Sequence, residues 1–357
     1  MSSPFDHGGT IFAMARELGV PAAAIADFSA SINPLGLSPA MKEAITDALD
    51  SLVHYPDNSH QELKQALADH HGISPAAIAV ANGSTELIYQ LPALLPGRRA
   101  LIVSPAFSEY QYALDRHHWE VQPFILPAAN GFELDLGALE QTLAGGYDAL
   151  YLCTPGNPTG RLYPPALVEQ VYRLCCASGT FLVLDEAFMD FCEAASAKQL
   201  IAGRDNAVIL RSMTKFFAIP GLRLGYAIAS EAVVARLTAL GGPWSVNTLA
   251  QAAGVAAIRD VEHSRRTIDF VRQERGYLAE RLSRLPLLTV YPSAANFLLV
   301  EITGGMTAGE LKARLLPHRL LIRDCASFTG LTPRFFRIAV RTREENERLL
   351  ACLERIL

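Results

Sequence analysis

Six short, continuously apolar runs, separated by segments with a helical pattern, constrain the fold of this chain more than any other feature. Such runs predict strands that are buried on both faces, and their alternation with helices predicts a mostly parallel sheet covered by helices on both sides. An α/β fold is therefore expected. The apolar runs are 78–81, 100–103, 121–125, 149–153, 181–184 and 207–210, and the expected helices are 85–95, 107–116, 135–144, 164–177 and 194–202.

The last third of the chain has a different pattern. A long helical region spans about 248–285 and is followed by strands that alternate with shorter helices. This order predicts a smaller α+β segment. Its expected strands are 297–300, 320–322 and 336–340, and its expected helices are 307–315 and 343–356.

The composition fits a compact soluble protein rather than a disordered one. A chain of 357 residues with 50% hydrophobic and 19% charged residues can bury a sizeable core. The net charge is −5, and no stretch concentrates lysine and arginine, so no nucleic-acid partner is expected. No apolar run approaches the length of a membrane span, so no membrane association is expected either.

The cysteines and histidines do not indicate a metal site. The six cysteines lack the paired spacing of zinc ligands and are interpreted as free thiols in a reducing compartment. Adjacent histidines at 70–71 and 117–118 do not share a helix face, so we expect them at the surface or at helix ends. Asp6, His7 and Arg16 lie in the first helical stretch, which leaves no visible signal peptide and favours a cytoplasmic location.

Three polar residues stand at or just beyond the ends of apolar runs. Asn157 follows the run 149–153, Asp185 follows 181–184, and Lys215 follows 207–210. In an open α/β sheet, ligands bind at the carboxyl ends of the strands. A lysine there can condense with an aldehyde as a Schiff base, provided that burial and nearby cations lower its pKa.

The order of four motifs resembles a known family. Asn-Pro-x-Gly (157–160), Asp-Glu-Ala (185–187), Ser-x-x-Lys (212–215) and Gly-x-Arg-x-Gly (221–225) are similar to the pyridoxal-phosphate (PLP) enzymes of aminotransferase fold type I. The resemblance covers nearly the whole chain and implies a mostly parallel seven-stranded sheet with a smaller α+β domain. It also implies domain boundaries: residues 1–45 form an arm and first helix that join the small domain, 46–250 the large PLP-binding domain, and 251–357 the small C-terminal domain.

The resemblance assigns the residues around the cofactor. Lys215 would form the Schiff base, Asp185 would face the pyridine nitrogen, and Asn157 would donate to the ring oxygen. Many aminotransferases of this fold have a tyrosine where this chain has Phe188, so a second donor to the ring oxygen is missing. Phe107 would stack on the ring. The phosphate would be held by Gly83, Ser84, Thr85, Ser212 and Arg223, and by Tyr55 from the neighbouring subunit, which implies a homodimer with shared active sites.

Within this fold, the chain most resembles the L-threonine-O-3-phosphate decarboxylases of cobalamin biosynthesis. The segments that carry this resemblance are 7–9, 28–36, 185–188, 321–326 and 336–341. The His-Gly-Gly arm at 7–9 is the most discriminating, because histidinol-phosphate aminotransferases usually lack it. The implied reaction releases CO2 and (R)-1-aminopropan-2-yl phosphate. Arg337 would hold the substrate carboxylate, and Arg323 and His7 its phosphate. The implied substrate-binding residues are His7, Gly8, Asn33, Asn157, Arg323 and Arg337.

Other readings of the same residues stay open at this point. The side chains do not reveal which Cα bond is held perpendicular to the cofactor, so a histidinol-phosphate-type aminotransferase is the first alternative. A PLP-binding regulator is the second, although such regulators usually carry a DNA-binding module ahead of the fold. The sequence also leaves open a preference for threonine phosphate or serine phosphate, because one methyl group contributes only about 1–3 kcal/mol.

Overall fold

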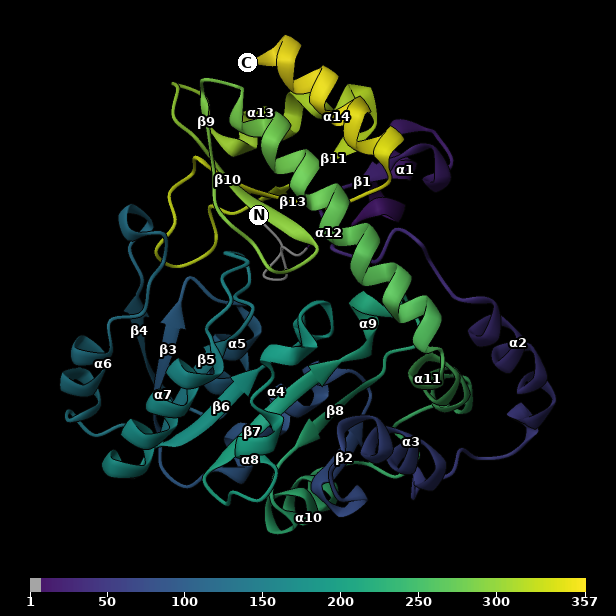
Figure 1. Cartoon of the computed structure of the whole chain (residues 1–357), viewed down its shortest axis with the longest axis vertical. Helices are drawn as coiled ribbons and strands as arrows, with labels where there is room; N and C mark the ends of the chain where they lie inside the picture. The colour runs from purple at the N-terminus through teal and green to yellow at the C-terminus, as the bar shows by residue number, and fades with distance from the viewer. Residues whose placement is uncertain (1–7) are drawn as a thin grey trace.

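The computed structural model describes residues 8–357 and is organised around a seven-stranded sheet (Figure 1). The strand order is β2-β8-β7-β6-β5-β3-β4. The neighbours from β7 to β4 are parallel, and β8 runs antiparallel to both β7 and β2. The prediction of a mostly parallel α/β sheet is confirmed. The strands are β2 (Ile78–Ala81), β3 (Arg99–Ser104), β4 (Glu120–Ile125), β5 (Ala149–Cys153), β6 (Phe181–Asp185), β7 (Ala207–Ser212) and β8 (Gly225–Ile228).

Helices cover both faces of this sheet because alternate side chains of each strand point to opposite sides. Tyr151, Val183 and Val208 belong to one apolar layer, with α4 (Ser84–Leu94), α5 (Glu109–Arg116) and α10 (Glu231–Leu240). Leu150, Leu182 and Ile209 belong to the layer on the other face. Each such side chain contributes about 1.5–3 kcal/mol on burial. The helices packed into that second layer are α3 (Gln61–His71), α6 (Leu136–Leu143), α7 (Pro165–Ser178) and α8 (Lys198–Ile201).

A smaller antiparallel sheet lies above the large one in Figure 1. Its order is β12-β13-β10-β9, and a two-stranded parallel pair, β1 with β11, stands beside it. The strands are β1 (Ala26–Asp27), β9 (Leu288–Val290), β10 (Phe297–Ile302), β11 (Leu320–Leu321), β12 (Arg323–Asp324) and β13 (Phe335–Ala339). The helices packed around them are α1 (Ile11–Leu18), α12 (Val261–Ser283), α13 (Ala308–Leu315) and α14 (Arg343–Ile356).

Two sequence predictions for this region need correction. The helical region 248–285 is divided into α11 (Thr248–Arg259) and α12, because the Asp260 side chain accepts from the His263 backbone N–H and starts a new helix. The run 320–322 does not form a single strand. Residues 320–321 form β11, which pairs with β1, and after Ile322 the chain continues as β12 in the four-stranded sheet. Helix α2 (Pro39–Asp47) packs against α11 and starts at the Ser38 cap.

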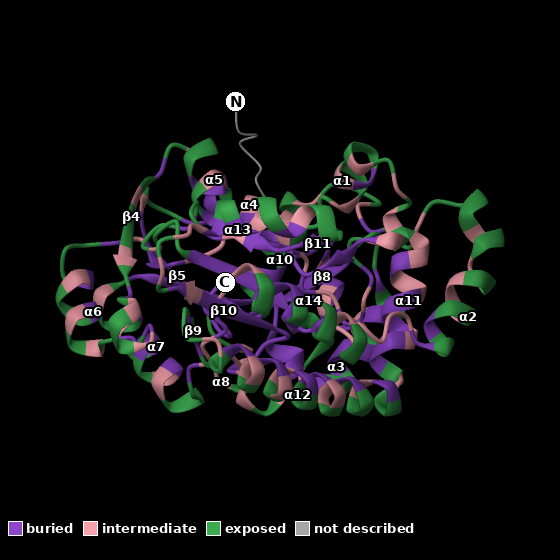
Figure 2. Ribbon diagram, turned by 90° about the horizontal axis from the view of Figure 1, so that it is seen from above, coloured by how far each residue is buried: buried purple, intermediate pink, exposed green. Residues whose placement is uncertain are grey.

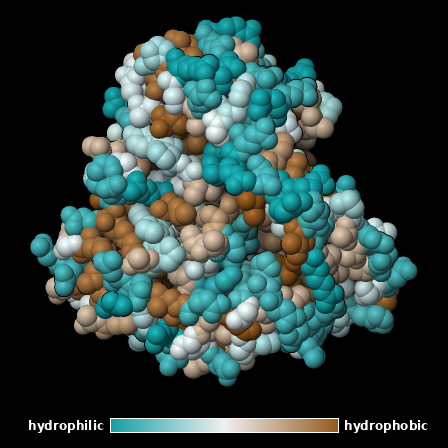
Figure 3. Space-filling view, viewed as in Figure 1, coloured by the Kyte–Doolittle hydropathy of each residue, from teal (hydrophilic) through white to brown (hydrophobic). Residues whose placement is uncertain are grey.

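The burial pattern follows from this arrangement. In Figure 2 most strands form the buried centre, and many exposed residues lie on the outer faces of the helices. The edge strand β4 is intermediate to exposed, so the prediction that the run 121–125 is buried on both faces is wrong: β4 has a neighbouring strand on one side only. On the face shown in Figure 3, hydrophilic and hydrophobic residues are interspersed in small groups. In residues 8–357, no helix is long and apolar enough to cross a membrane. All six cysteines are unpaired.

Candidate active site

A cavity of about 620 Å³ opens where the carboxyl ends of β5, β6 and β7 face the smaller sheet. The large sheet contributes Asn157, Asp185 and Lys215 to its wall, and these residues lie together as the strand ends predict. The smaller sheet and the N-terminal arm form the opposite wall. The predicted residues that line the cavity are Gly8, Ser84, Thr85, Phe107, Asn157, Asp185, Lys215, Arg223, Arg323 and Arg337.

Lys215 lies on the short helix α9 (Met213–Phe216), directly after β7. Its Nζ donates to Ser212 Oγ at 3.0 Å. Burial lowers the pKa of Lys215 to about 8; the carboxylate of Asp185 opposes this shift, and the guanidinium groups of Arg223 and Arg337 add to it. A substantial fraction of the amine is therefore neutral near pH 8 and can attack a carbonyl carbon.

Asp185 ends β6 and is almost completely buried. Burial raises the pKa of its carboxyl group, whereas hydrogen bonds from Tyr110 and Ala187 and the nearby Lys215 oppose that shift. The Ala187 N–H donates to Oδ1 at 2.8 Å, and the Tyr110 hydroxyl donates to Oδ2 at 2.5 Å. The motif located Asp185 correctly, but no sequence signal pointed to Tyr110.

The turn before α4 is a cradle of N–H donors. The first N–H groups of a helix have no intrahelical acceptor, so those of Ser84 and Thr85 are available to an anion in the cavity. Gly83 has a φ of 80°, and a Cβ on it would lie 2.8 Å from Arg223 Nη2. A Cβ on Gly225 would lie 2.3 Å from the Ser84 nitrogen. Glycine at both positions lets the backbone close around a phosphate.

These groups together fit PLP. Lys215 would supply the amine for its aldehyde, Asp185 a buried carboxylate for its ring nitrogen, and the turn at Ser84 and Thr85, with Arg223, the donors for its phosphate. Phe107 and Phe188 supply apolar walls for the ring. Each of these protein groups therefore matches a different part of PLP: its aldehyde, its ring nitrogen, its phosphate or its ring.

Two arginines face the cavity from the smaller sheet. Arg323 and Arg337 are directly paired across β12 and β13, and they are only 6% and 8% exposed. Arg337 Nη1 donates to Asn157 Oδ1, and Nη2 donates to the Ser29 carbonyl at 3.0 Å. Burial lowers the pKa of Arg337 to about 10, so the guanidinium remains charged at neutral pH. Arg323 Nη2 donates to Ser327 Oγ at 3.1 Å.

The N-terminal arm closes the same side of the cavity. Gly8 lies so close to Ser29 that a Cβ on Gly8 would be 2.1 Å from the Ser29 oxygen. The Gly9 N–H donates to Ser29 Oγ at 2.9 Å, and that hydroxyl donates to the buried Asp27 at 2.5 Å. Sequence reasoning missed Asp27 and Ser29, and His7 lies outside the described residues.

Four other predicted residues do not line the cavity. Asn33 is buried, and its side-chain amide donates to the Phe216 carbonyl at 2.9 Å and to Thr267 Oγ1 at 3.0 Å, so the structure gives it a packing role beside the site. Gly83 lies against Arg223, and Ser212 Oγ accepts from Lys215, so both contact residues that line the cavity. Tyr55 is 77% exposed and stacks on Trp244, with 4.4 Å between the ring centroids.

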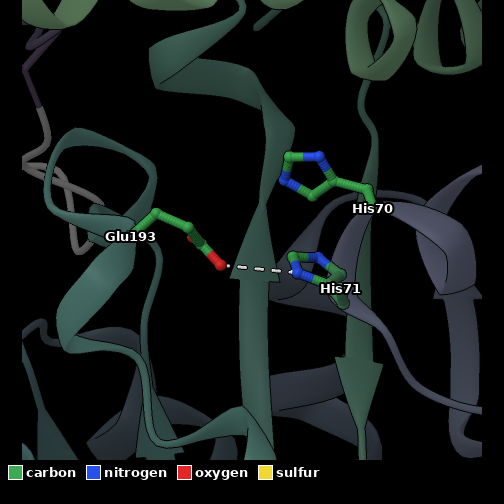
Figure 4. Close-up of side chains that lie close together, drawn as sticks. All are labelled: His70, His71 and Glu193. Carbon is green, nitrogen blue, oxygen red and sulfur yellow. Dashed lines mark ion pairs between the residues drawn. The ribbon is translucent and has the colours of Figure 1, made fainter.

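His71 ends α3, so its predicted place at a helix end is confirmed. It is buried, and its Nε2 lies 2.6 Å from the Tyr226 hydroxyl. Figure 4 shows His70, His71 and Glu193 close together. The Lys198 ammonium lies 2.5 Å from Glu193 Oε1 and 3.3 Å from His71 Nδ1. A protein cation therefore already occupies the position between these groups, and we assign no metal there.

Comparisons with known proteins agree with this geometry. A family model for aminotransferases of class I and II matches residues 24–353. A threonine-phosphate decarboxylase of Salmonella typhimurium is 43% identical over 354 residues, which cover 98% of this chain and 96% of that protein. The crystal structure of L-threonine-O-3-phosphate decarboxylase from Porphyromonas gingivalis superposes with a TM-score of 0.80 at 30% identity and covers 92% of this chain and 98% of its own.

A histidinol-phosphate aminotransferase is also similar. The enzyme from Sinorhizobium meliloti, solved in complex with pyridoxal-5'-phosphate, superposes with a TM-score of 0.86 at 25% identity. The match covers 99% of this chain and 95% of that structure.

Proposed function

This chain belongs to the class I and II aminotransferase family and is a PLP-dependent enzyme, and from that premise we propose that it decarboxylates L-threonine O-3-phosphate. The products would be (R)-1-aminopropan-2-yl phosphate and CO2, and the reaction would serve cobalamin biosynthesis. The similarity to threonine-phosphate decarboxylases, at 43% identity with almost complete coverage of both chains, supports this proposal.

The observation that carries the proposal is the pair of buried arginines in one cavity with the lysine. Arg323 and Arg337 present two guanidinium groups opposite Lys215. Guanidinium groups bind carboxylate and phosphate bidentately. A phospho-amino acid carries both anions on a short frame, so it would match the pair, with the carboxylate on Arg337 and the phosphate on Arg323.

Asn157 links substrate binding to cofactor binding. Its Oδ1 accepts from Arg337, which leaves the amide N–H groups as the donors that can reach the cofactor ring oxygen. Phe188 offers no hydroxyl to that oxygen, and its ring packs edge-on against Phe297, with 4.9 Å between the centroids. We infer that Asn157 alone supplies this contact and that Arg337 fixes its orientation.

The chain would then need to hold the substrate and return one proton. PLP, when bound, supplies an electron sink for the electrons left when a Cα bond breaks. Arg337 would orient the carboxylate for departure, and Lys215, released when the substrate amine takes its place, would hold the proton that Cα needs. Phe107, Phe188 and Phe328 line the cavity and would limit the access of water.

Amino transfer to an oxo acid is the second candidate, because a histidinol-phosphate aminotransferase superposes on almost the whole chain. Histidinol phosphate carries a phosphate but no carboxylate. In that reaction one arginine would serve the phosphate, and the carboxylates would come from the amino acceptor. The arginine pair therefore favours the phospho-amino acid without requiring it.

A homodimer with shared sites is part of the proposal. Tyr55 and Trp244 form a stacked aromatic pair on the surface, 77% and 47% exposed, and Tyr55 does not line the cavity of its own chain. Tyr55 would reach the cofactor phosphate of the second subunit. Sedimentation of the active enzyme should show a dimer, and full activity in a monomer would contradict this assignment.

The decisive experiment measures CO2. PLP-loaded protein is incubated with carboxyl-labelled L-threonine O-3-phosphate, without any oxo acid, and the released label is counted against PLP-free protein. Catalytic release over many turnovers is the expected result. If no label is released, and activity appears only with 2-oxoglutarate and histidinol phosphate, the enzyme is an aminotransferase and the decarboxylase proposal is wrong.

A further inference from the structure

The Asp185 carboxylate accepts a hydrogen bond from the phenol of Tyr110, a residue that lies outside the motifs assigned to the cofactor. Tyr110 lies on α5, is 1% exposed, and donates its hydroxyl to Asp185 Oδ2 at 2.5 Å. The other oxygen, Oδ1, accepts from the Ala187 backbone N–H at 2.8 Å. Both oxygens of the carboxylate therefore have a fixed donor from the protein.

The direction of this hydrogen bond is well defined. Burial raises the pKa of Tyr110 well above its ordinary value, and the neighbouring Asp185 adds to that shift, so the phenol keeps its proton and acts as the donor. The other titratable groups near Asp185 are Lys215 and Cys153, and burial raises the pKa of the Cys153 thiol beyond the physiological range. Once the Lys215 amine has condensed with an aldehyde, it is no longer a free ammonium group. Tyr110 is then the side chain that still favours the charged form of Asp185.

We propose that Tyr110 is a positioning residue that keeps Asp185 ionised and thereby keeps a proton on the pyridine nitrogen of PLP. A hydrogen bond to a carboxylate stabilises its charged form relative to the protonated acid. Asp185 and the pyridine nitrogen would share one proton, and a donor on the far side of the carboxylate shifts that proton towards the nitrogen. The inference rests on the cofactor site and is independent of which reaction the enzyme catalyses.

The turn that leads from Phe107 into α5 would serve the cofactor twice. Phe107 and Tyr110 are three residues apart, and their rings meet edge-on with 5.9 Å between the centroids. Both rings line the cavity, and the Tyr110 hydroxyl donates to the Asp185 carboxylate. A shift of this turn would disturb both contacts, which ties the stacking ring to the charge of Asp185.

The chain offers a matched control for the hydroxyl. Tyr151 is also buried, its ring lies 5.5 Å from that of Tyr110, and its hydroxyl has no hydrogen-bond partner in the described part of the chain. Tyr110→Phe and Tyr151→Phe each remove one buried hydroxyl from the same aromatic cluster. Only the first removes a donor to Asp185.

The test reads the proton on the cofactor directly. Both variants and the unsubstituted enzyme are loaded with PLP carrying ¹⁵N in the ring, and the ¹⁵N chemical shift is recorded at fixed pH. In Tyr110→Phe the resonance should move towards the value of neutral pyridine, while Tyr151→Phe should stay at the unsubstituted value. Incorporation of 3-fluorotyrosine at position 110, a stronger donor of similar size, should move it the opposite way.

Each outcome decides the proposal. An unchanged ¹⁵N shift in Tyr110→Phe, or an equal shift in both phenylalanine variants, would overturn it, because packing rather than the hydroxyl would then be responsible. If Tyr110→Phe does not fold, the fluorotyrosine protein gives the answer, and no movement there overturns the proposal. Release of CO2 is measured separately, so a failure of the proposed reaction cannot be confused with a failure of this inference.

Discussion

The two walls of the cavity are built in different ways. The cofactor wall, which carries Asp185 and Lys215, is built within the large sheet and its helices: Lys215 is hydrogen-bonded to Ser212, and Asp185 to Ala187 and to Tyr110 of α5. The substrate wall joins segments from opposite ends of the chain, since Arg337 is hydrogen-bonded to the carbonyl of Ser29, 308 residues away. Folding of the large sheet is enough to form the cofactor wall. The substrate wall forms only when the N-terminal arm and the smaller sheet come together. Loss of a cofactor residue and loss of a substrate residue should therefore have separable effects.

Lys215→Ala should have the largest effect. It removes the amine that would anchor the cofactor and move the proton, so turnover should fall by at least about 10³-fold and the visible absorbance of the bound cofactor should disappear. Absorbance spectra and single-turnover assays measure both effects. Lys42→Ala, on the exposed face of α2, is the control and should change neither quantity. Survival of absorbance and turnover in Lys215→Ala would show that the cofactor wall has been assigned wrongly.

Arg323→Gln tests the other wall. It removes a charged donor to the substrate while leaving every cofactor contact in place, so KM should rise by roughly 10- to 100-fold, the range for one hydrogen bond to a charged group. The cofactor spectrum should not change. Arg314→Gln on the exposed side of α13 provides the comparison. A loss of cofactor from Arg323→Gln would mean that the two walls are not separable.

The contrast between the walls also explains what could be predicted. The buried strands were recognisable because each is a short apolar run, and Asn157, Asp185 and Lys215 were recognisable because their motifs are local. Asn33 was different: its segment resembles a substrate-binding segment, but its amide is used by Phe216 and Thr267, which are remote in sequence.

Long-range contacts account for most of the missed residues. Tyr110 and Asp185 are 75 residues apart, and only the packing of α5 onto one face of the large sheet brings the phenol to the carboxylate. His71 was expected at the surface or at a helix end, but the pattern of α3 does not reveal that Tyr226 of β8 would lie against its ring. Asp27 and Ser29 gained a role only when β1 paired with β11 beside the cavity. None of these partners is close enough in sequence to form a motif.

Lys215→Met tests the stability of the cofactor wall. The pKa of Lys215 falls from an ordinary 10.5 to about 8, so in the PLP-free protein the unfolded chain binds the proton more tightly than the folded chain. The free energy of unfolding should then be reduced by a constant amount below about pH 8 and should recover as the pH rises towards 10.5. The lowering of the pKa from 10.5 to about 8 would reduce the free energy of unfolding by at most about 3 kcal/mol. The actual reduction is smaller because the amine is partly open to the cavity.

Denaturant unfolding of the PLP-free proteins at pH 7 and pH 10 provides the measurement. Lys215→Met should be more stable than the unsubstituted protein at pH 7, and the difference should shrink at pH 10. A constant difference at both pH values would mean that the gain comes from packing of the methionine rather than from the charge. Such a result would mean that the buried charge of Lys215 does not destabilise the PLP-free folded protein.

Gly8→Ala should have the smallest effect and is confined to the substrate wall. The new Cβ would lie 2.1 Å from the Ser29 oxygen, so the arm must move away from the segment that also accepts from Arg337. Overpacking of this kind costs about 1–3 kcal/mol, which would raise KM by roughly 5- to 100-fold while the cofactor spectrum stays unchanged. Gly203→Ala is the control, because a Cβ there meets nothing within 4 Å and its φ is not positive. If Gly8→Ala lowers kcat and leaves KM unchanged, the arm acts on the reacting groups and not on substrate binding, and the division of the cavity into two independent walls fails.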